Sequence, residues 1–295
     1  MIFARDKSQM CNNLLQYAHV YAWGREHGRK VISMRFSYKY QFFHICHTDL
    51  TGFGWYLFAK YMAALHLLPT ASFKRRDCDR EALERKMLRH RHIVVSGWFA
   101  RWYDLFLKYR PEICELFTID PEITDPVKVK MQEAERAVAE RTVAEPVEAK
   151  PVEAKPVEAK ILRLGVHIRR GDYAEWRDGQ FFFDNGVYAQ HINRFQALFP
   201  EKSIHVYLST NDPSVTEEEY QQLCPSVHIH HLHGNAPEDL FMLSECDYLI
   251  GPPSTFSMVA GMYHDLPLYR MDTRDANEMT LERFLKFDYW FSHMV

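Results

Sequence analysis

The second half of the chain alternates between two hydrophobic spacings that together predict a parallel β/α sheet. Short apolar runs, typical of buried strands, are followed by stretches in which apolar residues recur every three or four positions, as in amphipathic helices. The predicted strands cover residues 162–168, 204–208, 227–232 and 248–250. The predicted helices cover residues 185–199, 215–223, 237–244 and 255–263. This order is typical of a Rossmann-like unit, and without G-x-G-x-x-G it does not favour NAD as a ligand.

The first half of the chain shows the same two spacings less regularly. Helices are predicted over 12–27 and 55–67, and strands over 30–34 and 93–96. This pattern favours a second α/β unit. The predicted fold is therefore α/β, with two Rossmann-like domains facing a cleft.

Three consecutive copies of Pro-Val-Glu-Ala-Lys, at 146–160, separate the two halves. A proline at every fifth residue prevents a continuous helix, and one valine per copy cannot build a core. The charged, alanine-rich run before the copies can be helical. We therefore expect an N-terminal domain over 1–130, a charged linker over 131–160 and a C-terminal domain over 161–295.

Length and composition fit two globular domains. The chain has 295 residues, of which 47% are hydrophobic, and a formal net charge of -3. This charge predicts no general attraction to nucleic acid or to an anionic membrane, so any anion site must be local. The six cysteines have no C-x-x-C spacing and predict neither a zinc ribbon nor a disulfide framework. Since no apolar stretch reaches about 18 residues and the N-terminus is not signal-like, we expect a cytoplasmic protein without a membrane span.

Two arginines at the end of the first strand of the second half are the strongest candidates for chemistry. Arg169 and Arg170 leave a buried strand at the edge where open α/β sheets bind ligands. Paired guanidinium groups suit a diphosphate because each offers a fork of donors to two oxygens, and Asp172 can hold one of them in place. The alternatives are ordinary surface ion pairs and an Arg-Gly-Asp adhesion signal, which needs a protruding loop rather than a strand end.

Three further polar groups follow strands of the same predicted sheet. Ser254, Thr255 and Ser257 begin a helix whose free N–H groups and dipole can bind an anion, or they simply cap it. Asp239 lies in the first turn of another helix, where the dipole favours an acid and where a carboxylate can also accept two N–H groups of guanine. The third group is a loop that can contact a nucleotide or form an ordinary turn, and it comprises Ser209, Asn211 and Asp212.

Four histidines close together raise the question of a metal site. His228 and His230 point to one side of the predicted strand, while His231 points to the other and His233 follows. They do not converge, so we expect no zinc site. A histidine that lines a nucleotide pocket is the favoured interpretation.

The segment H-I-R-R-G-D-Y at 167–173 resembles the H-x-R-R-x-D signature of the α-1,2-fucosyltransferases, which α-1,6- and protein O-fucosyltransferases share more loosely. N-N-L-L-Q-Y-A at 12–18 is similar to the N-terminal segment of that family, and residues 97–106 and 238–263 are similar to two later segments. The chain departs from the family at Asn13, which replaces a glutamine, and next to the helix-capping serine, where Pro252 and Pro253 stand. These positions bear on acceptor and sugar choice.

The resemblance implies a GT-B fold whose C-terminal domain binds GDP-fucose and whose N-terminal domain presents the acceptor. It implies that both arginines hold the diphosphate, that Asp239 reads guanine, and that the enzyme is inverting and uses neither metal nor cofactor. With the residues identified above, the predicted donor site comprises His167, Arg169, Arg170, Ser209, Asn211, Asp212, Asp239, Ser254, Thr255, Phe256 and Ser257. Asn12 and Asn13 are the predicted acceptor-side residues.

The predicted reaction requires a group that stabilises the leaving diphosphate and a base that accepts a proton. As the bond from fucose to GDP breaks, negative charge develops on the diphosphate, and fixed arginines with a helix N-terminus stabilise it. A base must take the proton of the acceptor hydroxyl, and the candidates are Glu175, Asp178 and Asp172. Together with Arg169 they form the predicted catalytic set.

The leading hypothesis is a cytoplasmic fucosyltransferase of bacterial type that modifies a surface glycan or its lipid-linked precursor, with peripheral membrane association. The chain shows none of the N-terminal membrane anchor of mammalian relatives, which favours this setting. The alternatives are a GT-B transferase that uses another GDP-sugar, and a non-catalytic module for nucleotide-sugar binding or adhesion.

Overall fold

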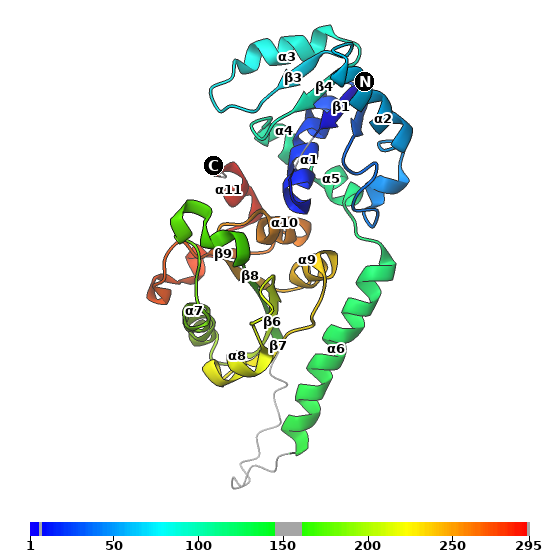
Figure 1. The fold of residues 1–295 in the computed structure, drawn as a ribbon. Helices are drawn as coiled ribbons and strands as arrows, with labels where there is room; N and C mark the ends of the chain where they lie inside the picture. Colours follow the sequence, from blue (N-terminus) through cyan, green and yellow to red (C-terminus); the bar gives the residue numbers. More distant parts are fainter. Residues whose placement is uncertain (6–7, 145–160, 294–295) are drawn as a thin grey trace. The chain divides into compact units, whose positions relative to one another are not determined.

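The chain forms two compact units in the computed structural model, which describes residues 1–5, 8–144 and 161–293. The N-terminal unit is Met1–Asp120 and the C-terminal unit is Pro121–Val295. Figure 1 shows that each has a sheet with helices packed on it. The three Pro-Val-Glu-Ala-Lys copies lie outside the described residues.

The N-terminal unit is built on four parallel strands in the order β2-β1-β4-β3. The strands are β1 (Ile2–Arg5), β2 (Val31–Ser33), β3 (Thr70–Ser72) and β4 (Ile93–Ser96). The helices are α1 (Met10–Glu26), α2 (Phe53–Ala64), α3 (Arg80–Arg89), α4 (Tyr103–Lys108) and α5 (Arg110–Leu116). The elements predicted at 12–27, 30–34, 55–67 and 93–96 are confirmed, whereas β1 and β3 were not predicted because so few residues show no periodicity.

The C-terminal unit is built on five parallel strands in the order β7-β6-β5-β8-β9. The strands are β5 (Ile161–Ile168), β6 (Ser203–Thr210), β7 (His228–His230), β8 (Tyr248–Gly251) and β9 (Leu268–Arg270). The helices are α6 (Pro121–Ala144), α7 (Asn185–Leu198), α8 (Glu217–Leu223), α9 (Ala236–Ser244), α10 (Thr255–His264) and α11 (Phe287–Ser292). Every strand and helix predicted for this half is confirmed, and β9 and α11 extend the pattern.

The central strand β5 sends alternate side chains to the two faces of its sheet, as a strand must. The residues that share a core cluster with α7 and α8 are Leu164, Val166 and Ile168. Gly165 and His167 face the other way, since His167 contacts Phe256 of α10 and a Cβ on Gly165 would lie 2.8 Å from Leu243 of α9. One face is thus covered by α7 and α8 and the other by α9 and α10, and glycine at 165 lets α9 approach closely.

The long helix α6 (Pro121–Ala144) is part of the C-terminal unit, so residues 131–144 are not the linker that was expected, while 145–160 lie outside the described residues. The compact units meet at Asp120 rather than near residue 130, and α6 packs against α9. Val127 and Met131 are buried, and Glu135 pairs with Arg163 of β5 at 2.7 Å. These contacts recur every four residues on one side of a charged helix, a pattern too sparse to stand out in an alanine-rich run. In the described ranges no helix combines the length and apolar character needed to cross a membrane.

Candidate functional site

Three polar loops leave the C-terminal sheet along one edge. In the parallel register, Ile168 at the end of β5 pairs with Thr210 of β6, and Val166 pairs with Ile250 of β8. The loops that follow β5, β6 and β8 therefore begin side by side. This is the edge at which open α/β sheets bind ligands.

The two adjacent arginines after β5 differ in their surroundings. Arg169 continues the side of His167, and Arg170 continues the side of Ile168, toward α7. Arg170 donates from Nε to the carbonyl of Phe183, just before α7, at 3.1 Å. The shared binding of a diphosphate by both arginines stays a prediction.

The Arg170 side chain is buried and holds the loop after β5 in place. It is 8% exposed, and its two terminal nitrogens donate to Oδ2 of Asp212, at 2.9 Å, and to Oδ1 of Asn185. With the bond from Nε, all three guanidinium nitrogens are engaged within the protein. This burial also rules out Arg170 as part of an exposed Arg-Gly-Asp adhesion signal.

The loop after β6 binds Arg170 and so helps to hold the loop after β5. Asn211 accepts the backbone N–H of Arg170 at 3.0 Å, and Asp212 accepts that of Ser214 at 2.9 Å. Hydrogen bonds from Ser214 and Arg170 hold the pKa of Asp212 below its usual value. Gly171 has φ +51°, and a Cβ there would lie 2.7 Å from Nδ2 of Asn211. Asn211 and Asp212 therefore hold the loop in shape, and their expected contact with a nucleotide stays a prediction.

Arg169 is held beside the start of α10. Its guanidinium pairs with Asp172 at 2.7 Å and lies over the ring of Tyr173, 5.7 Å from the centroid. Tyr173 in turn donates its hydroxyl to the carbonyl of Pro253 at 2.5 Å. The side chains thereby connect the loop after β5 to the loop before α10.

The N-terminus of α10 has the expected cap. Oγ of Ser254 accepts the N–H of Phe256 at 3.2 Å, which confirms the predicted capping serine. Oγ of Ser257 donates to the carbonyl of Ser254 at 3.4 Å and is fully buried, so this hydroxyl serves the helix start. Thr255 is partly exposed in the first turn. A helix N-terminus beside a guanidinium group has the character of an anion site.

His167 lies beneath this edge as a neutral packing residue. Its side chain is 5% exposed, and its ring centroid lies 5.0 Å from that of Phe256. Burial, together with the nearby charge of Arg169, lowers the pKa of His167 to about 3. Within the described part of the chain, its Nδ1 has no hydrogen-bond partner.

Ser209 and Asp239 form a buried polar pair on the same face of the sheet as His167. Oγ of Ser209 donates to Oδ2 of Asp239 at 2.8 Å. Burial raises the pKa of Asp239 to about 7, although the bond from Ser209 opposes this shift. A buried carboxylate with a hydrogen bond from one hydroxyl suits a ligand that supplies further N–H donors.

A small pocket adjoins Asp239. Its lining residues are Val127, Lys130, Leu232, Gly234, Glu238, Asp239 and Met242. Val127 and Lys130 come from α6, and the sequence analysis missed them because it placed this segment at the end of the N-terminal domain. Val127 belongs to the sparse row of buried positions on α6, whereas Lys130 is exposed and no sequence signal marks it.

The three candidate bases lie in the loop after β5. Glu175 and Asp178 are exposed, and Asp178 has a left-handed backbone with φ +57°. Asp172 is half exposed and pairs with Arg169. The identity of the residue that accepts the proton stays a prediction.

The four histidines differ in burial, since His230 is buried with His205, His228 and His231 are partly buried and His233 is exposed. His205 Nδ1 lies 2.9 Å from His230 Nε2, and burial lowers the pKa of both to about 4. The rings of His231 and His233 lie beyond them, 4.0 Å apart. The pocket beside Asp239 is lined by other residues, and the expectation that a histidine lines a nucleotide pocket stays a prediction. Among the described residues, no group of three or more His, Cys, Asp or Glu side chains is placed to hold a metal ion.

Asn12 and Asn13 of the N-terminal unit differ in accessibility. Asn13 is fully buried, and its amide donates to the carbonyl of Ser8 at 2.7 Å while accepting the N–H of Ser8 at 3.0 Å. It ties the preceding loop to α1, so the structure contradicts an acceptor contact for Asn13. Asn12 is partly exposed and donates to Oγ of Ser8 at 2.9 Å.

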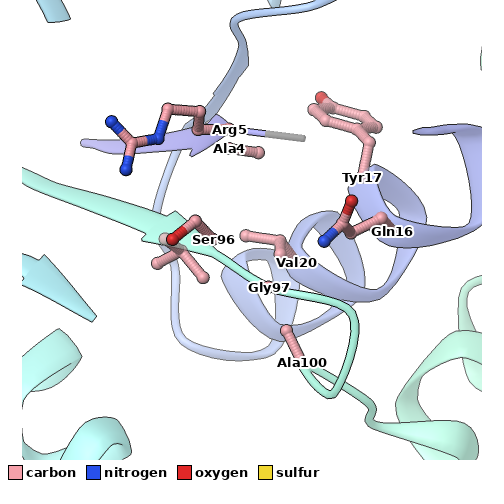
Figure 2. Close-up of a pocket in the computed structure, with 9 residues that line it drawn as sticks. Ala4, Arg5, Gln16, Tyr17, Val20, Ser96, Gly97 and Ala100 are labelled. Carbon is pink, nitrogen blue, oxygen red and sulfur yellow. The ribbon is translucent and has the colours of Figure 1, made fainter. Parts of the chain in front are cut away.

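A pocket at the ends of β1 and β4 was not predicted from the sequence. Figure 2 shows its walls, which come from these two strands, α1 and the loop after β4. The lining residues are Ala4, Arg5, Gln16, Tyr17, Val20, Val95, Ser96, Gly97 and Ala100. Oγ of Ser96 is buried there without a hydrogen-bond partner in the described ranges. The apolar run Ile2–Ala4 ahead of polar residues is the signal that would have placed β1 and its end.

Comparison with known proteins shows a shared fold. No protein-family model and no curated protein matches the chain in sequence. A mutant of Arabidopsis thaliana FUT1 in complex with GDP is 12% identical, with a TM-score of 0.57 over 92% of this chain and 71% of that one. POFUT1 is also 12% identical, with TM-scores of 0.52 in complex with GDP and 0.53 in complex with GDP-fucose, over 90% of this chain and 94% of that one. These similarities confirm the predicted α/β, GT-B-like fold class.

Proposed function

We propose that this protein is a glycosyltransferase that moves fucose from GDP-fucose to a hydroxyl group of a glycan. The observation that carries the proposal is the arrangement at one edge of the C-terminal sheet. Arg169 and the N-terminus of α10 lie together there, and the buried pair of Ser209 and Asp239 lies on the same face. A cation beside a helix dipole suits a diphosphate, and a carboxylate in a pocket suits guanine.

The shared fold supports this assignment. POFUT1 has been solved with GDP-fucose, and the Arabidopsis thaliana FUT1 mutant with GDP. We assign the pocket beside Asp239 to guanine, with Val127 and Lys130 of α6 along its wall. The carboxylate accepts N–H groups of the base, while Ser209 holds it in place.

The chemistry follows from where charge develops. When the bond from C1 of fucose to the diphosphate oxygen breaks, the bonding electron pair leaves with GDP. Arg169 and the α10 N-terminus stabilise the added negative charge, and their fixed positions avoid a reorganisation cost. The acceptor oxygen then forms the new bond to C1 and loses its proton to a base, for which Asp172, Glu175 and Asp178 are the candidates.

We assign the acceptor to the N-terminal unit. The pocket of Figure 2 offers Ser96 and Gln16 as polar groups among apolar walls, a composition that suits a sugar with its hydroxyls and apolar face. Asn12 lies at the start of the same helix, α1. We further propose an α-1,2 linkage formed with inversion and without a metal ion.

A donor screen tests the nucleotide assignment. Thermal melting in the presence of GDP, GDP-fucose, GDP-mannose and UDP-sugars should show selective stabilisation by GDP and GDP-fucose. Arg169→Ala should weaken GDP binding on the order of 10- to 100-fold, because a charge-assisted fork of hydrogen bonds is lost. Arg283→Ala is the matched control, since Arg283 is half exposed and pairs with Glu278 in the same unit. Equal stabilisation by UDP-sugars would overturn the donor assignment.

A transfer assay separates an enzyme from a binding module. Purified protein with GDP-fucose and a galactoside acceptor should release GDP and form a fucosylated product, with and without EDTA. The proton NMR spectrum of the product reports the linkage and the anomeric configuration. Tight GDP-fucose binding without product formation across an acceptor panel would favour the non-catalytic alternative.

A further inference from the structure

The helix α2 packs one face on the core through Ala59 and Met62 and presents further apolar side chains to solvent. Within Phe53–Ala64, Ala59 is the residue that is fully buried. Phe53 and Tyr61 are 59% and 58% exposed, and Leu65 just after the helix is 65% exposed. An exposed apolar patch of this kind usually marks a surface for another molecule.

Ring contacts hold several side chains of this patch in place. The ring of Tyr56 lies 4.6 Å from that of Tyr38 and 5.8 Å from that of Phe53. On the other side of the helix, Trp55 and Phe58 each contact Phe3 of β1 and are still about two-fifths exposed. The aromatic patch thus consists of Tyr38, Phe53, Trp55, Tyr56, Phe58, Tyr61, Leu65 and Leu67, and its anchored side chains keep their exposed parts in place.

Two lysines lie at or near the aromatic patch. Lys60 lies over the rings of Tyr56 and Tyr61, 5.5 and 5.7 Å from their centroids, and Lys39 lies over Tyr40 at 5.6 Å. In the described ranges, neither lysine forms an ion pair. Asp49 is the one acid between residues 35 and 67, and it pairs with Lys30 at 2.5 Å. The region is therefore locally basic in a chain whose net charge is -3.

We propose that the aromatic patch docks the N-terminal unit on an anionic lipid surface. Tryptophan and tyrosine with neighbouring lysines are the residues that settle at the boundary between acyl chains and headgroups. Twelve residues are too few to span a bilayer, which requires about 20, so α2 lies in the interface. This inference is independent of the donor site, because the patch lies in the other unit.

Two observations favour a lipid surface over a protein partner. Lysine is depleted in protein–protein interfaces, where arginine takes its place. A symmetric dimer through the patch would bring the same basic region of two copies together, so Lys60 and Lys39 would face like charges. A surface of anionic headgroups matches both the apolar centre and the basic rim.

Vesicle binding tests the proposal on the full chain. It should sediment with vesicles of phosphatidylcholine mixed with phosphatidylglycerol, less so with phosphatidylcholine alone, and salt should weaken binding. Lys60→Glu should weaken binding on the order of tenfold. The double variant Phe53→Ser/Tyr61→Ser should reduce it to background, while the matched double variant Leu281→Ser/Tyr289→Ser should bind like the parent, since both residues are similarly exposed in the C-terminal unit.

Fluorescence places the contact. The parent should show a blue shift in tryptophan emission with anionic vesicles, and Trp55→Phe should remove this shift while keeping sedimentation. Unchanged melting temperatures check that each variant folds. Absence of vesicle binding by the parent, or equal binding by Phe53→Ser/Tyr61→Ser, would overturn the proposal. A concentration-dependent dimer that the same double variant abolishes would assign the patch to a second copy instead.

Discussion

At the scale of single residues, two neighbouring arginines are expected to give opposite mutant phenotypes. Arg170→Ala should lower the free energy of unfolding by about 2–3 kcal/mol, because it removes a buried guanidinium and leaves the partly buried Asp212 carboxylate and the Phe183 carbonyl without their partner. Arg169→Ala should change the free energy of unfolding by less than about 1 kcal/mol, because the Asp172 side chain with which Arg169 pairs is half exposed. The same variant should lose GDP affinity. Chemical denaturation and calorimetric GDP titration measure the two effects. Similar stability losses in both variants would contradict the structural role of Arg170 and the GDP-binding role of Arg169.

Asp239 links pH, stability and donor binding. Its folded-state pKa of about 7 lies above the value near 4 of an unfolded chain, so the folded protein binds the proton more tightly. Stability from this group is present below pH 4 and is lost as pH rises toward 7. Asp239→Asn should therefore be more stable than the parent at pH 8, on the order of 2 kcal/mol, and equally stable at pH 4.

The same substitution should weaken GDP binding at pH 8 on the order of 100-fold, because an amide group cannot accept two N–H groups as a carboxylate does. GDP affinity of the parent should also fall as pH drops below 7. Melting curves at both pH values and GDP titrations measure these effects. A variant that keeps full GDP affinity would show that the guanine lies elsewhere.

The sequence predicted which residue types lie at the ligand-binding edge of the C-terminal sheet, but not the separate role of each residue. The order of strands and helices was enough to bring the Arg169 loop and the cap of α10 together. Arg169 and Arg170 have the same chemistry in the sequence, whereas the structure buries Arg170 among Asp212, Asn185 and Phe183 and pairs Arg169 with Asp172. The burial of Asn13 and Ser257 depends on packing between distant segments, which a linear pattern does not contain.

At the scale of elements, α6 is expected to stabilise the C-terminal unit through Glu135. This carboxylate accepts two bonds from Arg163, at 2.7 and 3.0 Å, and one from Tyr207 at 2.8 Å. Burial alone would raise the pKa of Glu135, but these hydrogen bonds outweigh it and lower the pKa. Its contribution is therefore present at neutral pH and is lost as pH falls through the lowered pKa.

Glu135→Ala should lower the free energy of unfolding at pH 7 by about 2–3 kcal/mol, because Arg163 loses its buried partner. Glu140→Ala on the same helix is the control, since its pair with Arg136 is largely exposed, and it should change stability by less than about 0.5 kcal/mol. Denaturant unfolding of both variants decides the matter. If Glu135→Ala changed the free energy of unfolding as little as Glu140→Ala, the contact between Glu135 and Arg163 would not stabilise the unit.

The elements that the sequence missed share a physical cause. The strands β1 and β3 have three or four residues, too few for a period to show, and their burial comes from neighbours far along the chain. The composition of residues 131–144 predicts a solvated segment, whereas α6 contacts the rest of the unit through a few positions on one side. Long-range pairing rather than local propensity decides such segments.

At the scale of the whole molecule, the division at Asp120 predicts which fragment retains donor binding. The residues that we assign to GDP lie in the C-terminal unit, which includes α6. A fragment over 121–295 should therefore fold cooperatively and bind GDP within about tenfold of the full chain. A fragment over 161–295, which begins at the boundary expected from the sequence, lacks Glu135 and the α6 wall of the Asp239 pocket. It should melt at lower temperature and bind GDP much more weakly. Circular dichroism melts and GDP titrations of both fragments test this directly, and equal affinity in the two would remove α6 from the donor site.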